Sequence, residues 1–226
     1  PSYMVTRDEK DSTRGRANTL RLAMNGQLGD QQLSDDSVRE VLDLCLECRA
    51  CKSECPVGVD MARYKSEFLS GYWDRHGLSA KARAFGSVHM TAAMGSALAP
   101  VANALASSRA GRWIAEQTLG LDRRRSLPKW TRRTLRTQAP TGDAGGVNAL
   151  LFADTFTNHS TPEIGIAAID VLNASGIATR VAPNVCCGRP LISQGRLEEA
   201  RRLAAANVHA LYDAAHRGHA LVFVEP

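Results

Sequence analysis

The chain has 226 residues, of which 44% are hydrophobic and 5% aromatic, and it carries a net charge of +5. This length predicts one or two domains with a sizeable core, and the lack of any run of eighteen apolar residues argues against a transmembrane helix. Four of the six cysteines lie in one motif and the other two are adjacent. That usage leaves none for a scattered disulfide framework and fits a reducing cytosol.

Two helices are predicted ahead of the cysteine motif. The first begins near Ala17, and Gly26 and Gly29 end it. The second begins with Ser37-Val38-Arg39-Glu40, which has the pattern of a capping box. We expect this second helix to deliver Cys45 at its C-terminal end.

Residues 45–56 read Cys-Leu-Glu-Cys-Arg-Ala-Cys-Lys-Ser-Glu-Cys-Pro, a C-x2-C-x2-C-x3-C-P run. This is the ferredoxin-type ligand spacing of a [4Fe–4S] cluster. A zinc site usually pairs two short cysteine units, or a cysteine pair with a histidine pair, across a longer gap. The sequence shows no secretory segment that would suggest an oxidising compartment, so disulfides are not favoured. The motif therefore predicts iron–sulfur ligation by Cys45, Cys48, Cys51 and Cys55.

A further helix is expected from Met61 to about Trp73, with three residues turned inward: Tyr64, Phe68 and Leu69. Helices on both sides of the ligand loop indicate an α-helical ferredoxin-like domain. Residues 77–120 continue as helix, punctuated by Pro100 and Gly111. We expect one group in it to fill the core rather than bind a cofactor: His89, Met90 and Met94.

A basic segment follows, from Asp122 to Arg136, with seven Lys and Arg. No recognised nucleic-acid module accompanies it, so a solvated linker or a docking surface is the favoured interpretation. Adsorption to anionic lipid headgroups is a minor alternative.

The pattern changes at Val147 to alternating strands and helices. Strands are predicted over 147–153, 177–181 and 220–224, with helices from Pro162 to Gly176 and from Leu197 to about Ala215. This order implies a parallel sheet with right-handed crossovers. The expected organisation is an α-helical [4Fe–4S] domain over 1–120, a basic linker over 121–146 and a partial α/β domain over 147–226.

Cys186 and Cys187 lie in the loop after the second predicted strand, where ligands of α/β sheets collect. Three interpretations stay open: metal ligands, a redox-active thiol pair, or buried inert cysteines. The loop after the first strand should lie beside them. Asp154 or His159 could contribute a ligand or hydrogen bond there, although a capping role for Asp154 is favoured.

These motifs together resemble the bacterial FAD-linked oxidoreductases in which a flavin domain is fused to an iron–sulfur and Cys-Cys-Gly domain, of the D-lactate, D-2-hydroxyglutarate or glycolate dehydrogenase type. The matching segments are Pro1-Ser2-Tyr3, Thr6–Lys10, Arg14–Arg16, Cys45–Asp60, Asp122–Lys129, Asp154–Glu163 and Cys186–Gly195.

The resemblance implies electron transfer from a flavin, held in a domain outside this chain, through [4Fe–4S] clusters to a quinone or other acceptor. An iron–sulfur subunit of a glycolate oxidase or heterodisulfide reductase-type complex is the alternative. The resemblance to the FAD-linked oxidoreductases also implies that Cys45, Cys48 and Cys51 share a cluster with a cysteine preceding Pro1, and that Cys55 binds a second cluster. We expect an internal piece of a longer cytoplasmic protein, with peripheral association with the inner membrane face left open.

Overall fold

The computed structural model describes residues 2–28, 35–142 and 146–224, which form two compact units. Unit 1 comprises the chain up to Gly86 together with residues 189–198, and unit 2 comprises the remainder. The two compact units are not separated at residues 120 and 146. The domain boundaries predicted at those residues stay a prediction. None of the helices among the described residues has the length and apolar character needed to cross a bilayer.

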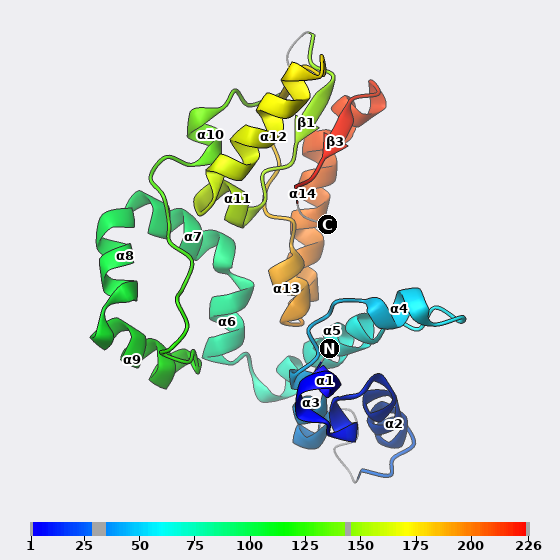
Figure 1. The fold of residues 1–226 in the computed structure, drawn as a ribbon. Helices are drawn as coiled ribbons and strands as arrows, with labels where there is room; N and C mark the ends of the chain where they lie inside the picture. The colour runs from blue at the N-terminus through cyan, green and yellow to red at the C-terminus, as the bar shows by residue number, and fades with distance from the viewer. Residues whose placement is uncertain (1, 29–34, 143–145, 225–226) are drawn as a thin grey trace. The chain divides into compact units, whose positions relative to one another are not determined.

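Unit 1 is helical (Figure 1). Its elements are α1 (Ser2–Thr6), a 3-10 turn (Glu9–Asp11), α2 (Thr13–Met24), α3 (Asp36–Asp43), α4 (Ala50–Glu54), α5 (Met61–His76), α6 (Ala80–Gly86) and α13 (Arg189–Ser193). Its core gathers apolar side chains of α2, α3 and α5: Leu20, Ala23, Val38, Leu42, Met61, Phe68, Leu69 and Tyr72.

The segment after α13 is fixed to α5 by two contacts within unit 1. Trp73 donates its indole N–H to the carbonyl of Gln194 at 2.8 Å. Gly195 has a φ of +71°, and a Cβ there would lie 2.5 Å from the Cβ of Leu69. Only glycine combines that backbone conformation with so close an approach.

Unit 2 contains α7 (Val88–Ala97), α8 (Ala99–Ser107), α9 (Arg109–Leu119), α10 (Leu135–Gln138), α11 (Thr155–His159), α12 (Pro162–Ala174) and, from Glu199 onward, α14 (Leu197–His216). Its strands are β1 (Ala149–Leu151), β2 (Thr179–Val181) and β3 (Ala220–Val222). They form a parallel sheet in the order β2-β1-β3, with Ala149 opposite both Thr179 and Ala220. The predicted parallel sheet is therefore confirmed.

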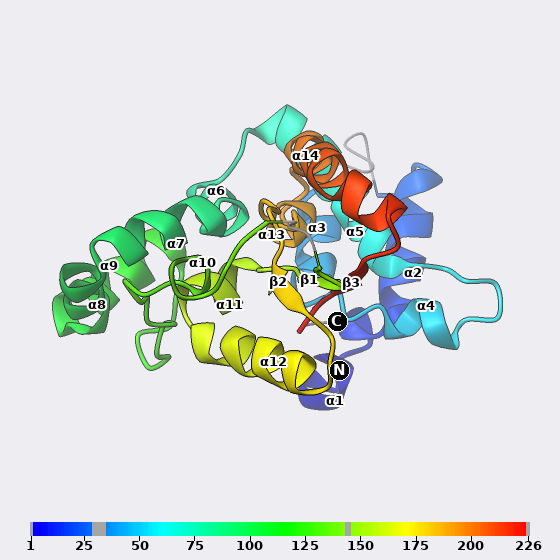
Figure 2. The ribbon, with the colours of Figure 1, turned by 90° about the horizontal axis from the view of Figure 1, so that it is seen from above.

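The sheet is covered on both faces. Figure 2 shows α12 and α14 on opposite sides of the strands. Because successive strand residues point to opposite faces, Leu150 packs with Leu211 of α14, whereas Leu151 packs with Ile169 of α12. Leu135, at the start of α10, is fully buried in this second cluster, so the predicted linker is packed here rather than solvated.

Three local expectations were wrong. The N-cap of α3 is Asp35, whose carboxylate accepts the N–H of Ser37 at 2.8 Å, so the helix begins before the predicted capping box. Tyr64 is exposed, although it shares α5 with the buried Phe68. Met90 and Met94 are also exposed, because the buried face of α7 consists of small residues instead. Gly29, predicted to help end α2, lies outside the described residues.

Candidate metal centre

The motif cysteines are presented by the loop between α3 and α5. Cys45 lies one residue beyond Leu44, the C-cap of α3, and its N–H donates to the carbonyl of Leu42 at 3.0 Å. Cys51 lies in α4 and is half-buried against the unit 1 core. Cys55 is the C-cap residue of α4. Cys48 is exposed and lies in the loop that precedes α4. The predicted delivery of Cys45 at a helix end is thus confirmed.

Two residues between the cysteines have a left-handed backbone. Glu47 has a φ of +53° and Arg49 a φ of +58°. This conformation costs a residue with a side chain about 1–2 kcal/mol. Alternation of right- and left-handed residues turns backbone N–H groups toward one concave side, a geometry that receives anions such as thiolates or sulfide.

Three of the cysteines share one cavity. It has a volume of about 510 Å³ and is lined by Cys45, Cys48 and Cys51, with Ser2 and Tyr3 of α1 on another side. Cys55 is absent from the described residues that line it. The loop therefore separates its cysteines into a group of three and a single fourth residue.

The sulfur of Cys55 has its own set of partners. Backbone N–H groups of Val59, Val57 and Gly58 lower the pKa of this thiol below its usual value. Hydrogen bonds of this kind favour a thiolate, and at a cluster they raise the reduction potential by stabilising negative charge on sulfur.

A charged side chain of α5 contacts both the backbone and a carboxylate of the cysteine loop. Lys65 donates to the carbonyl of Cys45 at 2.8 Å, and its ammonium lies 3.5 Å from the carboxylate of Glu47. Both side chains are nearly buried, and burial raises the pKa of the Glu47 carboxyl. The same Glu47 oxygen has no well-formed hydrogen bond to any described residue, so the contact with Lys65 is chiefly electrostatic. The sequence motif did not predict Lys65.

Among the residues that the structure describes, no three Cys, His, Asp or Glu side chains converge closely enough to hold a metal ion. The donor chemistry nevertheless fits an iron–sulfur cluster, because three thiols of the motif line one cavity. The four motif cysteines remain the proposed ligands.

The second cysteine site lies in unit 2, after β2. Cys186 is buried and Cys187 is exposed. Hydrogen bonding from Cys187, the N–H of Gly188 and the hydroxyl of Thr155 lowers the pKa of Cys186 to about 5, with a smaller electrostatic contribution from His89. The Thr155 hydroxyl is 3.6 Å from the Cys186 sulfur.

Two asparagines hold the backbone of this loop. Asn207 of α14 donates to the carbonyl of Cys186 at 2.9 Å and accepts the N–H of Val185 at 2.8 Å. Asn184 bonds both backbone groups of Ala153, in the loop after β1. These contacts join residues far apart in the sequence, so no local pattern could have revealed them.

The loop after β1 lies beside Cys186, as the sequence predicted, but its contact is Thr155. Asp154 caps α11 instead, accepting the N–H groups of Phe156 and Thr157 at 2.8 and 3.0 Å, which confirms the favoured capping role.

His159 bonds Ser96 through Nδ1 at 2.9 Å and Asn158 through Nε2 at 3.0 Å. Burial and the neighbouring Arg136 lower the pKa of His159.

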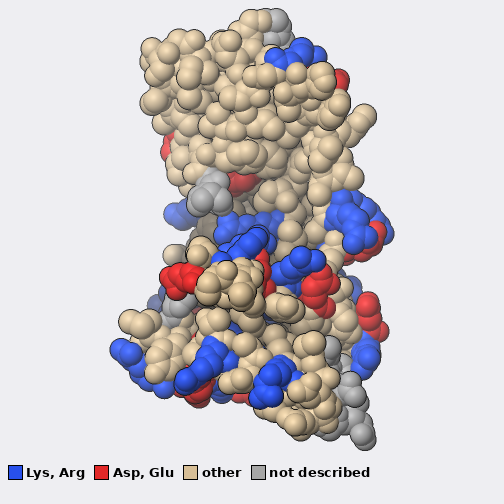
Figure 3. All heavy atoms as spheres, turned by 90° about the vertical axis from the view of Figure 1, so that its right-hand side faces the viewer, with Lys and Arg blue, Asp and Glu red and all other residues tan. Residues whose placement is uncertain are grey.

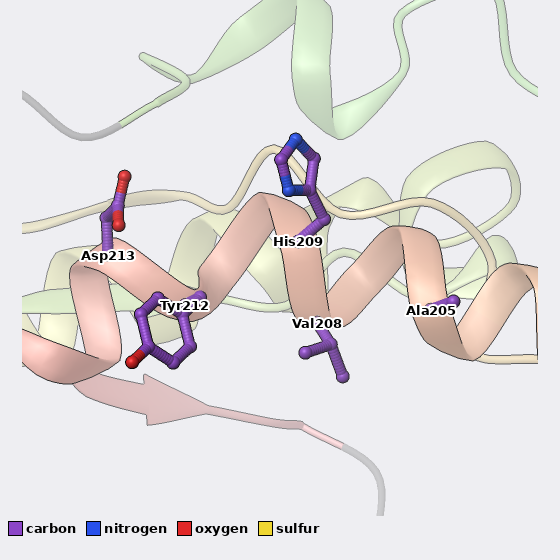
Figure 4. Close-up of a pocket in the computed structure, with 5 residues that line it drawn as sticks. All are labelled: Ala205, Val208, His209, Tyr212 and Asp213. Atoms are coloured by element: carbon purple, nitrogen blue, oxygen red, sulfur yellow. The ribbon is translucent and has the colours of Figure 1, made fainter.

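A shallow hollow also lies on α14. It is lined by five residues of that one helix: Ala205, Val208, His209, Tyr212 and Asp213. Figure 4 shows that Val208 and Tyr212 project from one side of the helix, whereas His209 and Asp213 project from the other. These groups do not converge on a common point, so the hollow is not a candidate for the chemistry.

Comparison with known proteins supports the N-terminal centre. Residues 1–59 match the family described as "4Fe-4S dicluster domain". One of the subunits of anaerobic glycerol-3-phosphate dehydrogenase from Escherichia coli (strain K12) is 33% identical over 121 residues, which cover 51% of this chain and 31% of that protein. No solved structure matches the chain significantly.

D-2-hydroxyglutarate dehydrogenase of Pseudomonas putida (strain KT2440) is 24% identical over 273 residues, covering 100% of this chain and 27% of that protein. The chain thus spans less than a third of either relative. These findings confirm the predicted iron–sulfur domain and the resemblance to dehydrogenases of the D-2-hydroxyglutarate type.

Proposed function

We propose that this chain is the iron–sulfur electron-transfer part of a FAD-dependent 2-hydroxy acid dehydrogenase, carrying electrons from a flavin domain to a quinone or other acceptor. The observation that carries the proposal is the cavity shared by Cys45, Cys48 and Cys51, within a region that matches a 4Fe-4S dicluster domain. The relatives' names specify dehydrogenation, which makes oxidoreductase chemistry the expected class.

The proposed ligand assignment follows the division of the loop. Cys45, Cys48 and Cys51 would hold one cluster in their cavity, which Ser2 and Tyr3 also line, and its fourth ligand would be a cysteine from another segment of the protein. Cys55, with its separate backbone donors, would bind a second cluster. This is the sharing of ligands known from two-cluster ferredoxin motifs.

A bound [4Fe–4S] cluster supplies one-electron acceptance and donation. The residues of the chain position and tune it. Lys65 fixes the Cys45 carbonyl, and with it the start of the ligand loop. Glu47 and Arg49, with their left-handed backbone, give the loop the kind of turn that can direct N–H groups toward bound sulfur. The N–H groups around Cys55 stabilise negative charge on that sulfur.

Cys186 and Cys187 are proposed to act at the acceptor end, as ligands or as a thiol pair. The low pKa of Cys186 supports this, because a thiolate is the form that binds metal or reacts. A glycolate oxidase or heterodisulfide reductase-type complex is the less favoured alternative, since the relatives are dehydrogenases.

Anaerobic reconstitution of the intact protein tests the relay. Iron and sulfide should bind, and reduction should give the EPR signal of a reduced cluster. Cys45→Ser should lower the iron content, whereas Leu46→Ser, an exposed position in the same loop, should retain it. Unchanged iron in Cys45→Ser would contradict the ligand assignment, and a cluster that resists reduction in a physiological range would contradict the relay.

A further inference from the structure

Arg16 is a buried arginine in the wall of the cysteine cavity. It is 6% exposed and lines the cavity that three of the motif cysteines share. Its guanidinium donates through Nε to the carbonyl of Val41 at 3.3 Å and through Nη2 to the hydroxyl of Ser2 at 3.0 Å. Both acceptors are neutral, so neither offsets the positive charge of the guanidinium.

The N-terminal turn of α2 fixes the position of Arg16. Ser12 is the N-cap of this helix, and its hydroxyl accepts the N–H of Gly15 at 2.9 Å. A Cβ at Gly15 would lie 2.0 Å from the carbonyl oxygen of Glu9, so the helix begins in direct contact with the preceding 3-10 turn. Ser12 lines the cavity as well. Arg16 therefore belongs to the end of α2 that forms part of the cavity wall.

This position is electrostatically unfavourable for a cation. The N-terminal end of a helix carries partial positive charge, which stabilises anions and destabilises cations. Arg16 lies in the first turn of α2, and its burial keeps water from screening its charge. A buried charge is costly unless an opposite charge accompanies it. An anion in the cavity would therefore stabilise this part of the fold.

No acidic side chain supplies that opposite charge within the part of the chain that the structure describes. The ion pairs found there do not include Arg16. Asp11, Glu47 and Glu54 also line the cavity, but only Glu47 forms an ion pair among the described residues, and its partner is Lys65. On the face of unit 1 drawn in Figure 3, Lys and Arg are interspersed with Asp and Glu. Arg16 differs from these surface cations.

We propose that Arg16 is the charge-compensating residue of the cluster cavity, and that its guanidinium raises the reduction potential of the cluster proposed to be held by Cys45, Cys48 and Cys51. An iron–sulfur cluster bound by thiolates is an anion, and its reduction adds a further negative charge. A fixed cation nearby stabilises the more negative state. The cluster in turn supplies the opposite charge that Arg16 lacks among the described residues.

The hydrogen bonds of Arg16 also connect it to the start of the ligand loop. Ser2 accepts from Arg16 and donates to the carbonyl of Leu44 at 2.6 Å, directly before Cys45. Through Val41, the same guanidinium contacts α3. These bonds alone would give Arg16 a structural role. The test therefore needs a readout that a structural role does not move, and the reduction potential is such a readout.

This inference rests on the proposed function, because it requires a cluster in the cavity. The two can nevertheless fail separately. A wild type that binds no iron and sulfide would contradict the proposed function itself. A wild type that loads normally, and whose potential is unchanged when Arg16 is neutralised, would contradict only the role of Arg16.

The experiment is a reductive titration of the intact, reconstituted protein, followed by EPR. Arg16→Gln removes the charge and should shift the reduction equilibrium about tenfold toward the oxidised cluster, which is a potential about 59 mV more negative for a one-electron couple. Arg16→Met is neutral and needs no hydrogen-bond partner, and it should give the same shift. Arg16→Lys keeps the charge and should stay near the wild-type potential.

The matched control is Arg14→Gln, in the same turn of α2. Arg14 pairs with Glu9 at 2.7 Å, and its side chain is 79% exposed. It is absent from the described residues that line the cavity. Water and salt screen a charge at such a position, so Arg14→Gln should keep the wild-type potential and iron content.

The role of Arg16 is overturned if both neutral variants keep the wild-type potential, if Arg14→Gln shifts it equally, or if Arg16→Lys behaves like the neutral variants. Iron content decides the case in which a variant fails to load. Loss of iron from both neutral variants but not from Arg16→Lys would support the proposal, because the charge would then be needed to hold the cluster. Loss from all three would overturn it, because the shape of the guanidinium would then matter rather than its charge.

Discussion

Lys65 and Cys45 are joined across twenty residues by a hydrogen bond of 2.8 Å from the ammonium to the backbone carbonyl. The same ammonium lies beside the carboxylate of Glu47. One α5 side chain thus holds both a proposed ligand residue and the left-handed turn that follows it.

Replacing Lys65 should loosen the ligand loop. Lys65→Met leaves the nearly buried Glu47 carboxylate without its cation, and should lower the free energy of unfolding by about 1–3 kcal/mol in urea titrations. The double variant with Glu47→Gln should recover part of this loss, since no uncompensated charge is left. Additive losses in the double-mutant cycle would show that the two side chains do not interact.

Cys186 should react as a thiolate under mildly acidic conditions. With a pKa of about 5, its alkylation, followed by mass spectrometry of the Cys186 peptide, should reach half its maximal rate near pH 5. Cys187→Ala removes the largest stabilising hydrogen bond and should move the midpoint upward. Thr155→Val should have a smaller effect in the same direction. A wild-type midpoint near that of an ordinary thiol, about 8.5, would contradict the assignment.

Asp154 should behave as a helix cap rather than as a ligand. Asp154→Ala removes the acceptor for two N–H groups at the start of α11 and should lower the unfolding free energy by about 1 kcal/mol. Asp154→Asn keeps a capping oxygen and should lose only a fraction of that. Iron content after reconstitution should be the same in both variants. A selective loss of iron would instead indicate ligation.

Acid should destabilise unit 2 through His159. Its pKa in the folded state is lowered by burial and by Arg136, so the unfolded state binds the proton more readily. The stability contributed by neutral His159 is present above the unfolded pKa of about 6.5 and is lost as pH falls through the folded value.

The measurement is the thermal midpoint as a function of pH from neutrality downward. In His159→Gln the decline below about pH 6.5 should be shallower by a few degrees. The variant retains an amide for Ser96, which limits the effect of the lost hydrogen bond. Parallel declines in both proteins would show that other groups govern acid sensitivity.

The features predicted from sequence were those carried by short spacing. The cysteine run, the alternation of strands and helices, and the cap at Asp154 depend on neighbouring residues, so local patterns contain them. Lys65 and Thr155 act on cysteines 20 and 31 residues away, and only the folded chain reveals such pairs. Periodicity also misjudged Met90 and Met94, because it identifies an apolar face without showing whether that face turns inward.

Cys51 belongs at once to the cavity proposed to hold a cluster and to the packing of the unit 1 helices. A ligand that holds its sulfur therefore also restrains α4 against Leu42, Phe68 and their neighbours. Binding energy at the sulfurs becomes folding energy of the helices, as in other small metal domains. Loss of iron should consequently be felt beyond the loop, as faster amide exchange in α3 and α5, so that the integrity of the redox centre and the lifetime of the folded chain are governed by the same equilibrium.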